Sequence, residues 1–273
     1  MTLVSIFFRK SVTSRDERRY NSVFVFDLAL MKILVVSDIH YSLQQYDWLV
    51  RESPGFDLVV IAGDLLEMAA PVDLDTQAAV VGQYCRKISA QVPLVVCSGN
   101  HDLLEDHEGV RSAEWLEELG IPGLVVDHGC YEADGLRILS FPWSESDEEK
   151  EKVAGWLATQ IDMDDPRTVI WVHHAPPYGA KTSWSGKHDF GDDFLVGWIE
   201  KYAPDVVFSG HVHNAPYYGP KGSWIDRVGH AVVINGGRQI GEKPATVELE
   251  VEDGTLIWCG MEGCEKKSLA TVE

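Results

Sequence analysis

Residues 32–40 read KILVVSDIH, a short apolar run that ends in an aspartate and a histidine. A run of this length and composition is typical of a strand buried on both faces. Four later segments have the same pattern of an apolar run followed by polar residues: DLVVIAGD at 57–64, PLVVCSGNHD at 93–102, TVIWVHH at 168–174 and DVVFSGHVH at 205–213. Each apolar run is followed by side chains that can bind a metal ion or move a proton.

Longer amphipathic segments separate the apolar runs, and this alternation indicates an α/β fold. Helices are expected over residues 44–52, 75–91, 110–119, 147–161 and 194–202. Strands are expected over residues 33–36, 58–61, 94–97, 137–141, 169–172, 206–208, 232–234, 245–251 and 255–258. The last of these strands follow one another through glycine-containing turns, so the second half of the chain favours β pairing.

The polar ends of the five apolar runs are expected to form one site. In open α/β sheets, ligands bind in the crevice beyond the carboxyl ends of the strands. In residues 38–40 and 211–213, two ligand-type side chains lie two positions apart on extended backbone, so each pair points the same way. Glycine precedes Asp64, Asn100 and His211, where a residue without a side chain lets the backbone turn tightly.

The side chains at these strand ends offer carboxylate oxygen, amide oxygen and imidazole nitrogen, and no thiolate. Such a donor set suits manganese, iron or zinc and is a poor match for copper(I) or iron–sulfur clusters. The candidates outnumber the ligands that one tetrahedral ion needs. Two ions that share one carboxylate would use them all.

The motifs D-x-H, G-D, G-N-H-D, H-H and G-H-x-H, in this order, resemble those of the calcineurin-like metallophosphoesterase superfamily. The resemblance implies a four-layer α/β/β/α sandwich of two packed mixed sheets with helices outside. It also implies two divalent or trivalent metal ions and hydrolysis of a phosphate ester by in-line attack of a metal-bridging hydroxide. The sequence GDLLE lacks the Asp-Arg-Gly of the phosphoprotein phosphatases, and the arrangement is more similar to the bacterial phosphodiesterase-like branch.

The resemblance also implies a ligand set, carried over position by position. One ion would be held by Asp38, His40 and His213, the other by Asn100, His173 and His211, and Asp64 would bridge them. His173 is preferred to its neighbour His174 because it directly follows the strand, as the matching histidine of the family does.

Catalytic roles follow from the same resemblance. His101 matches the family's catalytic histidine, which protonates the departing oxygen or stabilises its charge. Asn100 would stabilise negative charge on the phosphate, and Asp64 would contribute by bridging the two metal ions. Either Glu67 or Asp102 would orient the imidazole of His101.

Composition limits the partners. The 273 residues carry a net charge of −20, which repels a long phosphate backbone, so no stable nucleic-acid complex is expected. No apolar stretch is long enough to span a bilayer, and no membrane partner is expected. The expected substrate is a small phosphate ester, with a nucleotide as one option. The sequence does not indicate the oligomeric state.

Loop residues near the last two motifs allow more than one interpretation of the substrate. Aromatic residues there stack on a nucleobase or simply cover the sheet edges: Tyr178, Trp184, Tyr217, Tyr218 and Trp224. Basic residues there are phosphate partners or solvated loop charges: Lys181, Lys187 and Arg238.

The domain is expected to span residues 31–264. Residues 1–30 differ in charge from the rest and are interpreted as an extension that is disordered or not native, with Met31 as the natural start. Residues 265–273 are expected to form a polar, fraying tail. The five cysteines include no C-x-x-C pair, and reduced, buried thiols in a cytoplasmic protein are expected.

Two alternatives to a small-molecule esterase remain. Some proteins of this fold have lost catalysis and serve as scaffolds, but that fate usually removes ligands, and this chain retains them all. A nuclease of the same superfamily is the other option, although the acidic surface argues against a processive one.

Overall fold

A computed structural model describes residues 31–105, 107–133 and 135–272 of the chain. The expected extension at residues 1–30 lies outside these ranges. None of the helices within them has the length and apolar character that a bilayer crossing needs.

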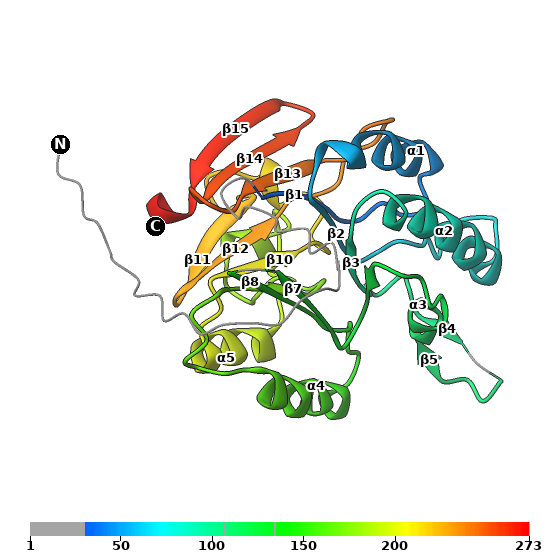
Figure 1. Cartoon of the computed structure of the whole chain (residues 1–273), viewed down its shortest axis with the longest axis horizontal. Helices are drawn as coiled ribbons and strands as arrows, with labels where there is room; N and C mark the ends of the chain where they lie inside the picture. The colour runs from blue at the N-terminus through cyan, green and yellow to red at the C-terminus, as the bar shows by residue number, and fades with distance from the viewer. Residues whose placement is uncertain (1–30, 106, 134, 273) are drawn as a thin grey trace, which may run out of the picture.

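Two mixed sheets form the centre of the molecule (Figure 1). The first has the strand order β15 (Gly263–Ser268), β14 (Thr255–Gly260), β13 (Thr246–Glu250), β1 (Lys32–Val36), β2 (Leu58–Ala62), β3 (Leu94–Cys97) and β6 (Leu124–Val125). The strands from β1 to β6 in this order run parallel, and β13, β14 and β15 pair antiparallel.

The second sheet has the order β11 (Ile225–Val228), β12 (Ala231–Asn235), β10 (Val206–Ser209), β9 (Thr168–Val172), β8 (Leu136–Ser140) and β7 (Gly129–Ala133). Its inner strands run parallel, and both edge strands are antiparallel to their neighbours. A small separate hairpin joins β4 (Leu104–Glu105) to β5 (Arg111–Ser112).

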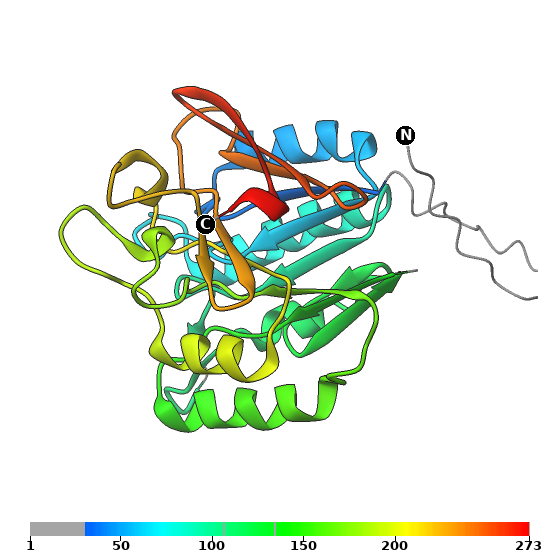
Figure 2. The ribbon, with the colours of Figure 1, turned by 90° about the vertical axis from the view of Figure 1, so that its left-hand side faces the viewer.

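Helices cover the outer faces of both sheets, and Figure 2 shows the layers edge-on. The first sheet packs against α1 (Leu43–Glu52), α2 (Leu74–Ser89) and α3 (Glu114–Glu118). The second packs against α4 (Asp147–Gln160) and α5 (Asp193–Tyr202). The four-layer sandwich predicted from the sequence is therefore confirmed.

The alternation of side chains along each strand explains the layers. In β1, Ile33 and Val35 point into the core between the sheets, whereas Leu34 and Val36 point to the core beneath α1 and α2. Because both faces of such a strand are buried, its sequence is a continuous apolar run. The core between the sheets fixes their separation and so holds the strand ends in register with each other.

The helix predicted at residues 110–119 is shorter in the structure. Residues Arg111–Ser112 pair in β5, and α3 covers only Glu114–Glu118. Several short strands were not predicted: β4, β5, β6, β7 and β11. Two-residue strands and edge strands contain too few apolar residues to give a periodic signal.

The prediction of a polar, fraying tail from residue 265 is wrong for its first part. Residues Gly263–Ser268 form β15, an edge strand paired antiparallel with β14. The Trp224 indole N–H donates to Glu265 Oε2 at 2.7 Å, and the Lys267 ammonium lies 5.7 Å from the centre of the Trp224 ring. An edge strand with exposed, charged side chains is ordinary, but its polar sequence hides it from a pattern search.

The expectation of five reduced, buried thiols is also wrong. Cys259 and Cys264 form a disulfide across the β14–β15 hairpin, where they lie directly opposite each other. Cys85 and Cys97 are free and buried, and Cys130 is half-buried. The pairing follows from the hairpin register, which the sequence spacing alone does not indicate.

Candidate active site

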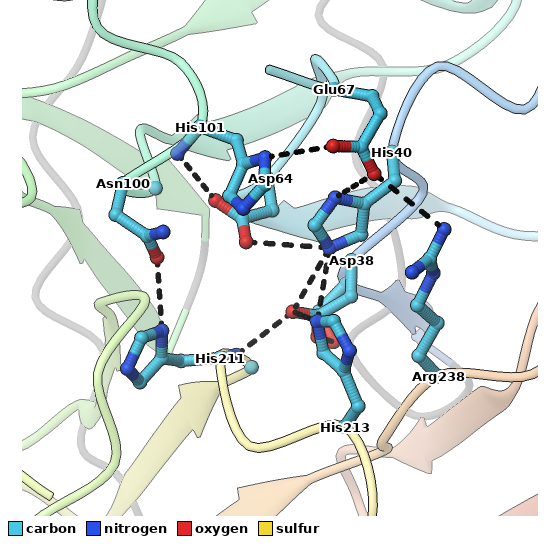
Figure 3. Close-up of polar contacts among 12 residues, drawn as sticks. Asp38, His40, Asp64, Glu67, Asn100, His101, His211, His213 and Arg238 are labelled. Carbon is cyan, nitrogen blue, oxygen red and sulfur yellow. Dashed lines mark hydrogen bonds and ion pairs between the residues drawn. The ribbon is translucent and has the colours of Figure 1, made fainter. Parts of the chain in front are cut away.

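The loops that follow β1, β2, β3, β9 and β10 meet at one edge of the sandwich. Figure 3 shows the polar side chains of four of these loops converging, together with Arg238 from the segment between β12 and β13. The structure thus brings together residues that lie up to 175 positions apart, from Asp38 to His213.

One group consists of Asp38, His40, Asp64 and His213, whose ligand atoms all lie within 4.8 Å of one another. His213 Nε2 is 3.3 Å from Asp38 Oδ1, and His40 Nε2 is 3.4 Å from Asp64 Oδ2. The two Nε2 atoms of His40 and His213 are 3.0 Å apart. Two imidazole nitrogens and two carboxylates that face a common point are suited to hold a divalent cation.

A second group lies on the other side of Asp64. His211 Nδ1 faces Asn100 Oδ1 at 2.9 Å. His174 Nε2 is 3.1 Å from Asp64 Oδ2, and the rings of His174 and His211 are 5.3 Å apart. The carboxylate of Asp64 therefore contacts a histidine of each group, which is the position that a shared ligand needs.

The structure corrects the choice of His173. The His173 ring stacks on Phe141 at a centroid distance of 4.8 Å, and its Nε2 is 4.0 Å from Asp192 Oδ2. Side chains alternate along β9, so His173 shares the helix-facing side with Trp171, and His174 shares the inter-sheet side with Val172. The histidine that reaches the site is His174.

The hydrogen bonds of His174 fit a metal ligand. Its Nδ1 donates to the Ala62 carbonyl oxygen at 2.7 Å, while its buried Nε2 lies 3.1 Å from Asp64 Oδ2. Metal-bound histidines usually donate their second ring N–H to a backbone carbonyl or carboxylate in this way. The residues present therefore fit the cation that the donor set calls for.

Neighbouring ionisable groups in the site shift one another's pKa values. Burial alone raises the pKa of Asp38, but the hydrogen bond with His213 and the nearby His174 outweigh it and hold the pKa well below its usual range. Burial tends to lower the pKa of His174, yet the carboxylate of Asp64 raises it to about 9. Without a metal ion, a protonated His174 thus offsets part of the buried negative charge.

Two other site histidines have lowered pKa values, in contrast to His174. Burial lowers the pKa of His40 to about 4, and burial together with the charge of His174 lowers the pKa of His211 to about 4. Both imidazoles are neutral near pH 7, which is the form that binds metal ions.

We expect metal affinity to rise with pH because of His174. Below about pH 9 an ion must displace its proton, whereas His40 and His211 are already neutral above about pH 5. Release of one proton predicts an affinity that rises about tenfold per pH unit between pH 6 and 8 for the ion bound by His174. Calorimetric titration with manganese at several pH values measures this slope, and a flat affinity would contradict the protonated state of His174.

The backbone at the site is strained. Asp38, His40, Asp64 and His211 have φ values of 55°, 47°, 55° and 65°, in the left-handed region that non-glycine residues rarely occupy. Each such residue costs roughly 1–3 kcal/mol, and such residues cluster at functional sites. The loops at the strand ends therefore place the candidate ligands at a cost in folding stability.

Two of the glycines that were predicted to allow tight turns lie directly against carboxylates of the site. A Cβ atom on Gly99 would lie 2.3 Å from Asp64 Oδ1, and one on Gly210 would lie 2.6 Å from Asp38 Oδ2. Any side chain at either position would displace a carboxylate of the site.

His101 lies at the partly exposed rim of the first group. Its backbone N–H donates to Asp64 Oδ1 at 2.9 Å, and its Nδ1 accepts from the Met68 N–H at 3.2 Å. The same Nδ1 is 3.4 Å from Glu67 Oε1, and the other Glu67 oxygen is 3.2 Å from His40 Nδ1. Glu67 therefore contacts His101 and a candidate ligand at once.

Asp102 has a different role from the one considered for it. Its buried carboxylate accepts the backbone N–H groups of Leu66 and Gly99, and burial raises its pKa to about 8. These contacts tie the Asp64 loop to the Asn100 loop. Of the two acids considered, Glu67 is the one that contacts the His101 imidazole.

The loop aromatics divide into two kinds. Trp224 is only 2 % exposed and stacks on Trp258, and Tyr217 packs against the same ring, so both belong to the core. Tyr178 and Tyr218 are exposed. Trp184 is half-buried beneath the Lys221 ammonium.

The loop cations lie apart from the polar network of the site, with one exception. Lys181 is paired with Asp226 at 3.6 Å, and Lys187 is exposed in the same loop. Arg238 lies 4.0 Å from Glu67 Oε2 and so borders the site.

Sequence reasoning missed Trp143, which follows β8. Its ring centre is 4.9 Å from that of His211 and 5.7 Å from that of His174. No motif marks this residue, and only the fold places it beside the second group.

Comparison with known families decides the class of the protein. Residues 31–215 match the family model of calcineurin-like phosphoesterases, which includes every loop that carries the site except the segment with Arg238. The chain belongs to the calcineurin-like phosphoesterase family. A search of curated proteins finds no match.

Solved structures similar to this calcineurin-like phosphoesterase confirm the fold. A protein from Thermus thermophilus aligns with a TM-score of 0.57 and 15 % identity, over 88 % of this chain and 99 % of that one. A dimetal phosphatase from Danio rerio aligns with a TM-score of 0.54 and 10 % identity, over 88 % and 99 %. A purple acid phosphatase from yellow lupin (Lupinus luteus) seeds aligns with a TM-score of 0.52 and 16 % identity, over 89 % and 52 %.

Adjacent histidines provide a matched pair of variants. We expect His174→Ala to lower the bound metal to at most one ion per chain, because it removes a nitrogen that faces Asp64. His173→Ala removes a ring that stacks on Phe141, so it should lower stability by about 1–3 kcal/mol and leave the metal content unchanged. Elemental analysis and thermal unfolding of both proteins measure these effects. Loss of metal in His173→Ala alone would restore the assignment made from the sequence.

Proposed function

We propose that this calcineurin-like phosphoesterase hydrolyses a small phosphodiester at a dinuclear metal centre. The observation that supports the proposal most strongly is the carboxylate of Asp64, which contacts His40 of one group and His174 of the other. A pair of ions is the arrangement that uses both groups at once. Manganese, iron and zinc all fit the oxygen and nitrogen donors.

The distances between the side chains support one ligand set for the two ions. One ion is assigned to Asp38, His40 and His213, the other to Asn100, His174 and His211, with Asp64 shared. When bound, such ions lower the pKa of a water molecule and neutralise charge on the phosphate.

The chain supplies the remaining chemistry. The Asn100 Oδ1 atom faces His211, so the Nδ2 group of Asn100 is the donor left for a phosphate oxygen. The His101 imidazole is partly exposed at the rim, where it can give a proton to the departing oxygen. The Met68 N–H donates to Nδ1 of that imidazole, which leaves the ring proton on Nε2, and the carboxylate of Glu67 lies 3.4 Å from the same Nδ1.

The charges at the rim favour a diester over a monoester. Arg238 lies next to the carboxylate of Glu67, which offsets its charge. A phosphomonoester carries one negative charge more than a diester near neutral pH, and the rim offers little to balance it. The net charge of −20 equally disfavours a long polyanionic substrate, so we propose a small ester and not a nucleic acid.

A comparison of two chromogenic substrates tests this function. With manganese bound, we expect kcat/KM for bis-p-nitrophenyl phosphate to exceed that for p-nitrophenyl phosphate. A preference for the monoester would contradict the diesterase. An absence of turnover with manganese, iron or zinc, together with stable capture of a partner protein, would instead favour the non-catalytic scaffold.

A further inference from the structure

A cleft of about 320 Å³ is lined in part by Trp143, the residue whose ring borders His174 and His211. It lies between the segment that joins β8 to α4 and the segment that joins β9 to α5. Its lining includes Trp143, Ala175 and Phe190. Ala175 directly follows His174 in the chain, and the Trp143 ring borders both histidines, so the cleft opens beside the second ligand group.

The apolar part of this cleft is aromatic and exposed. Phe190 is 52 % exposed, an unusual state for a phenylalanine, and it lines the same cleft as Trp143. Flat groups stack on such rings, and ligand pockets are commonly lined by aromatic side chains.

The charged side chains of the cleft are already paired. Lys150 Nζ is 3.1 Å from Asp192 Oδ1, and Glu145 Oε1 is 2.9 Å from Arg111 Nη1. Asp192 also accepts the Phe194 N–H at the start of α5. A second phosphate or another charged substituent would have to break one of these pairs, whereas an uncharged group would leave them intact.

We propose that this cleft binds an uncharged, flat aromatic group of the substrate while its phosphate lies at the metal centre. The proposal rests on the proposed phosphoesterase function and narrows it to aryl-type or nucleoside-type esters without additional phosphates. Trp143 and Phe190 are its specificity-determining residues.

Binding of two non-hydrolysable phosphinates to the manganese-loaded protein tests the proposal. Methylphenylphosphinate and dimethylphosphinate each carry one negative charge, as a phosphodiester does, and they differ in the aromatic ring. We expect calorimetry to show methylphenylphosphinate binding about tenfold more tightly, as expected for one stacking contact. This preference should fall to less than about threefold in Phe190→Ala and in Trp143→Ala and should persist in Trp143→Phe.

Tyr178→Ala is the matched control, because Tyr178 is 53 % exposed in the same loop as Phe190 and does not line the cleft. It should keep the full preference. Phe190 is exposed, so its variant should fold even if Trp143→Ala does not.

The possible results distinguish failure of the aromatic subsite from failure of the phosphoesterase function. Equal binding of both phosphinates to the wild-type protein, or a full preference retained in Phe190→Ala, would overturn the aromatic subsite and leave the phosphoesterase function standing. Failure of both phosphinates to bind would overturn both, because the group that the two compounds share reports on the metal centre.

Discussion

Replacement of Asp64 with alanine is expected to remove both metal ions and all measurable hydrolysis. Its Oδ2 lies 3.4 Å from His40 Nε2 and 3.1 Å from His174 Nε2, so one substitution deprives both ligand groups of their common oxygen. Loss of a residue that only supports a ligand weakens metal affinity by about 10–100-fold, and loss of the shared ligand itself should exceed about 100-fold. Elemental analysis after dialysis measures the content.

Two further variants serve as comparisons for Asp64→Ala. Asp64→Asn keeps the shape of the side chain and loses its charge, so it should also lose metal. Asp75→Ala alters an exposed acid in the first turn of α2 and should retain the wild-type metal content. If Asp64→Ala kept two ions per chain, the shared-ligand assignment would be wrong.

His101→Ala is expected to lower turnover by about 10²–10⁴-fold, the usual contribution of general acid catalysis, while the metal content stays unchanged. The side chain of His101 contacts Glu67 and the Met68 N–H, and only its backbone N–H touches Asp64. An alanine retains that N–H, so the ligand geometry survives the substitution.

The leaving group distinguishes proton donation from charge stabilisation or simple support. A p-nitrophenolate departs readily without a proton, whereas an alkoxide does not. The loss in His101→Ala should therefore be larger for an alkyl diester than for bis-p-nitrophenyl phosphate. Glu67→Gln should produce a smaller loss in the same direction, because it removes a negative charge that lies 3.4 Å from the ring. Equal losses for both esters, or loss of metal in His101→Ala, would contradict the role of an acid.

The strands that carry the motifs were predictable because they are buried on both faces. Leu58–Ala62 and Leu94–Cys97 are continuous apolar runs, and the polar residues after each run mark the edge where ligands gather. The residues of β15, in contrast, are mostly exposed and polar, so nothing in the sequence separates this strand from a tail.

The choice between His173 and His174 required the direction of each side chain. Position after the strand favoured His173, but the alternation along β9 turns that residue toward Phe141 and the helices. The same alternation was available in the sequence, because Trp171 and Val172 lie on opposite faces, yet which face is the inner one depends on how the sheets pack. Trp143 was unpredictable for a related reason, since its contacts with His174 and His211 arise only when β8, β9 and β10 pair.

Anomalous X-ray scattering from crystals of the manganese-loaded protein tests the central claim most directly. We predict two peaks per chain, one among Asp38, His40 and His213 and one among Asn100, His174 and His211, with the carboxylate of Asp64 in contact with both. A single peak, or a second peak away from Asp64, would contradict the dinuclear centre.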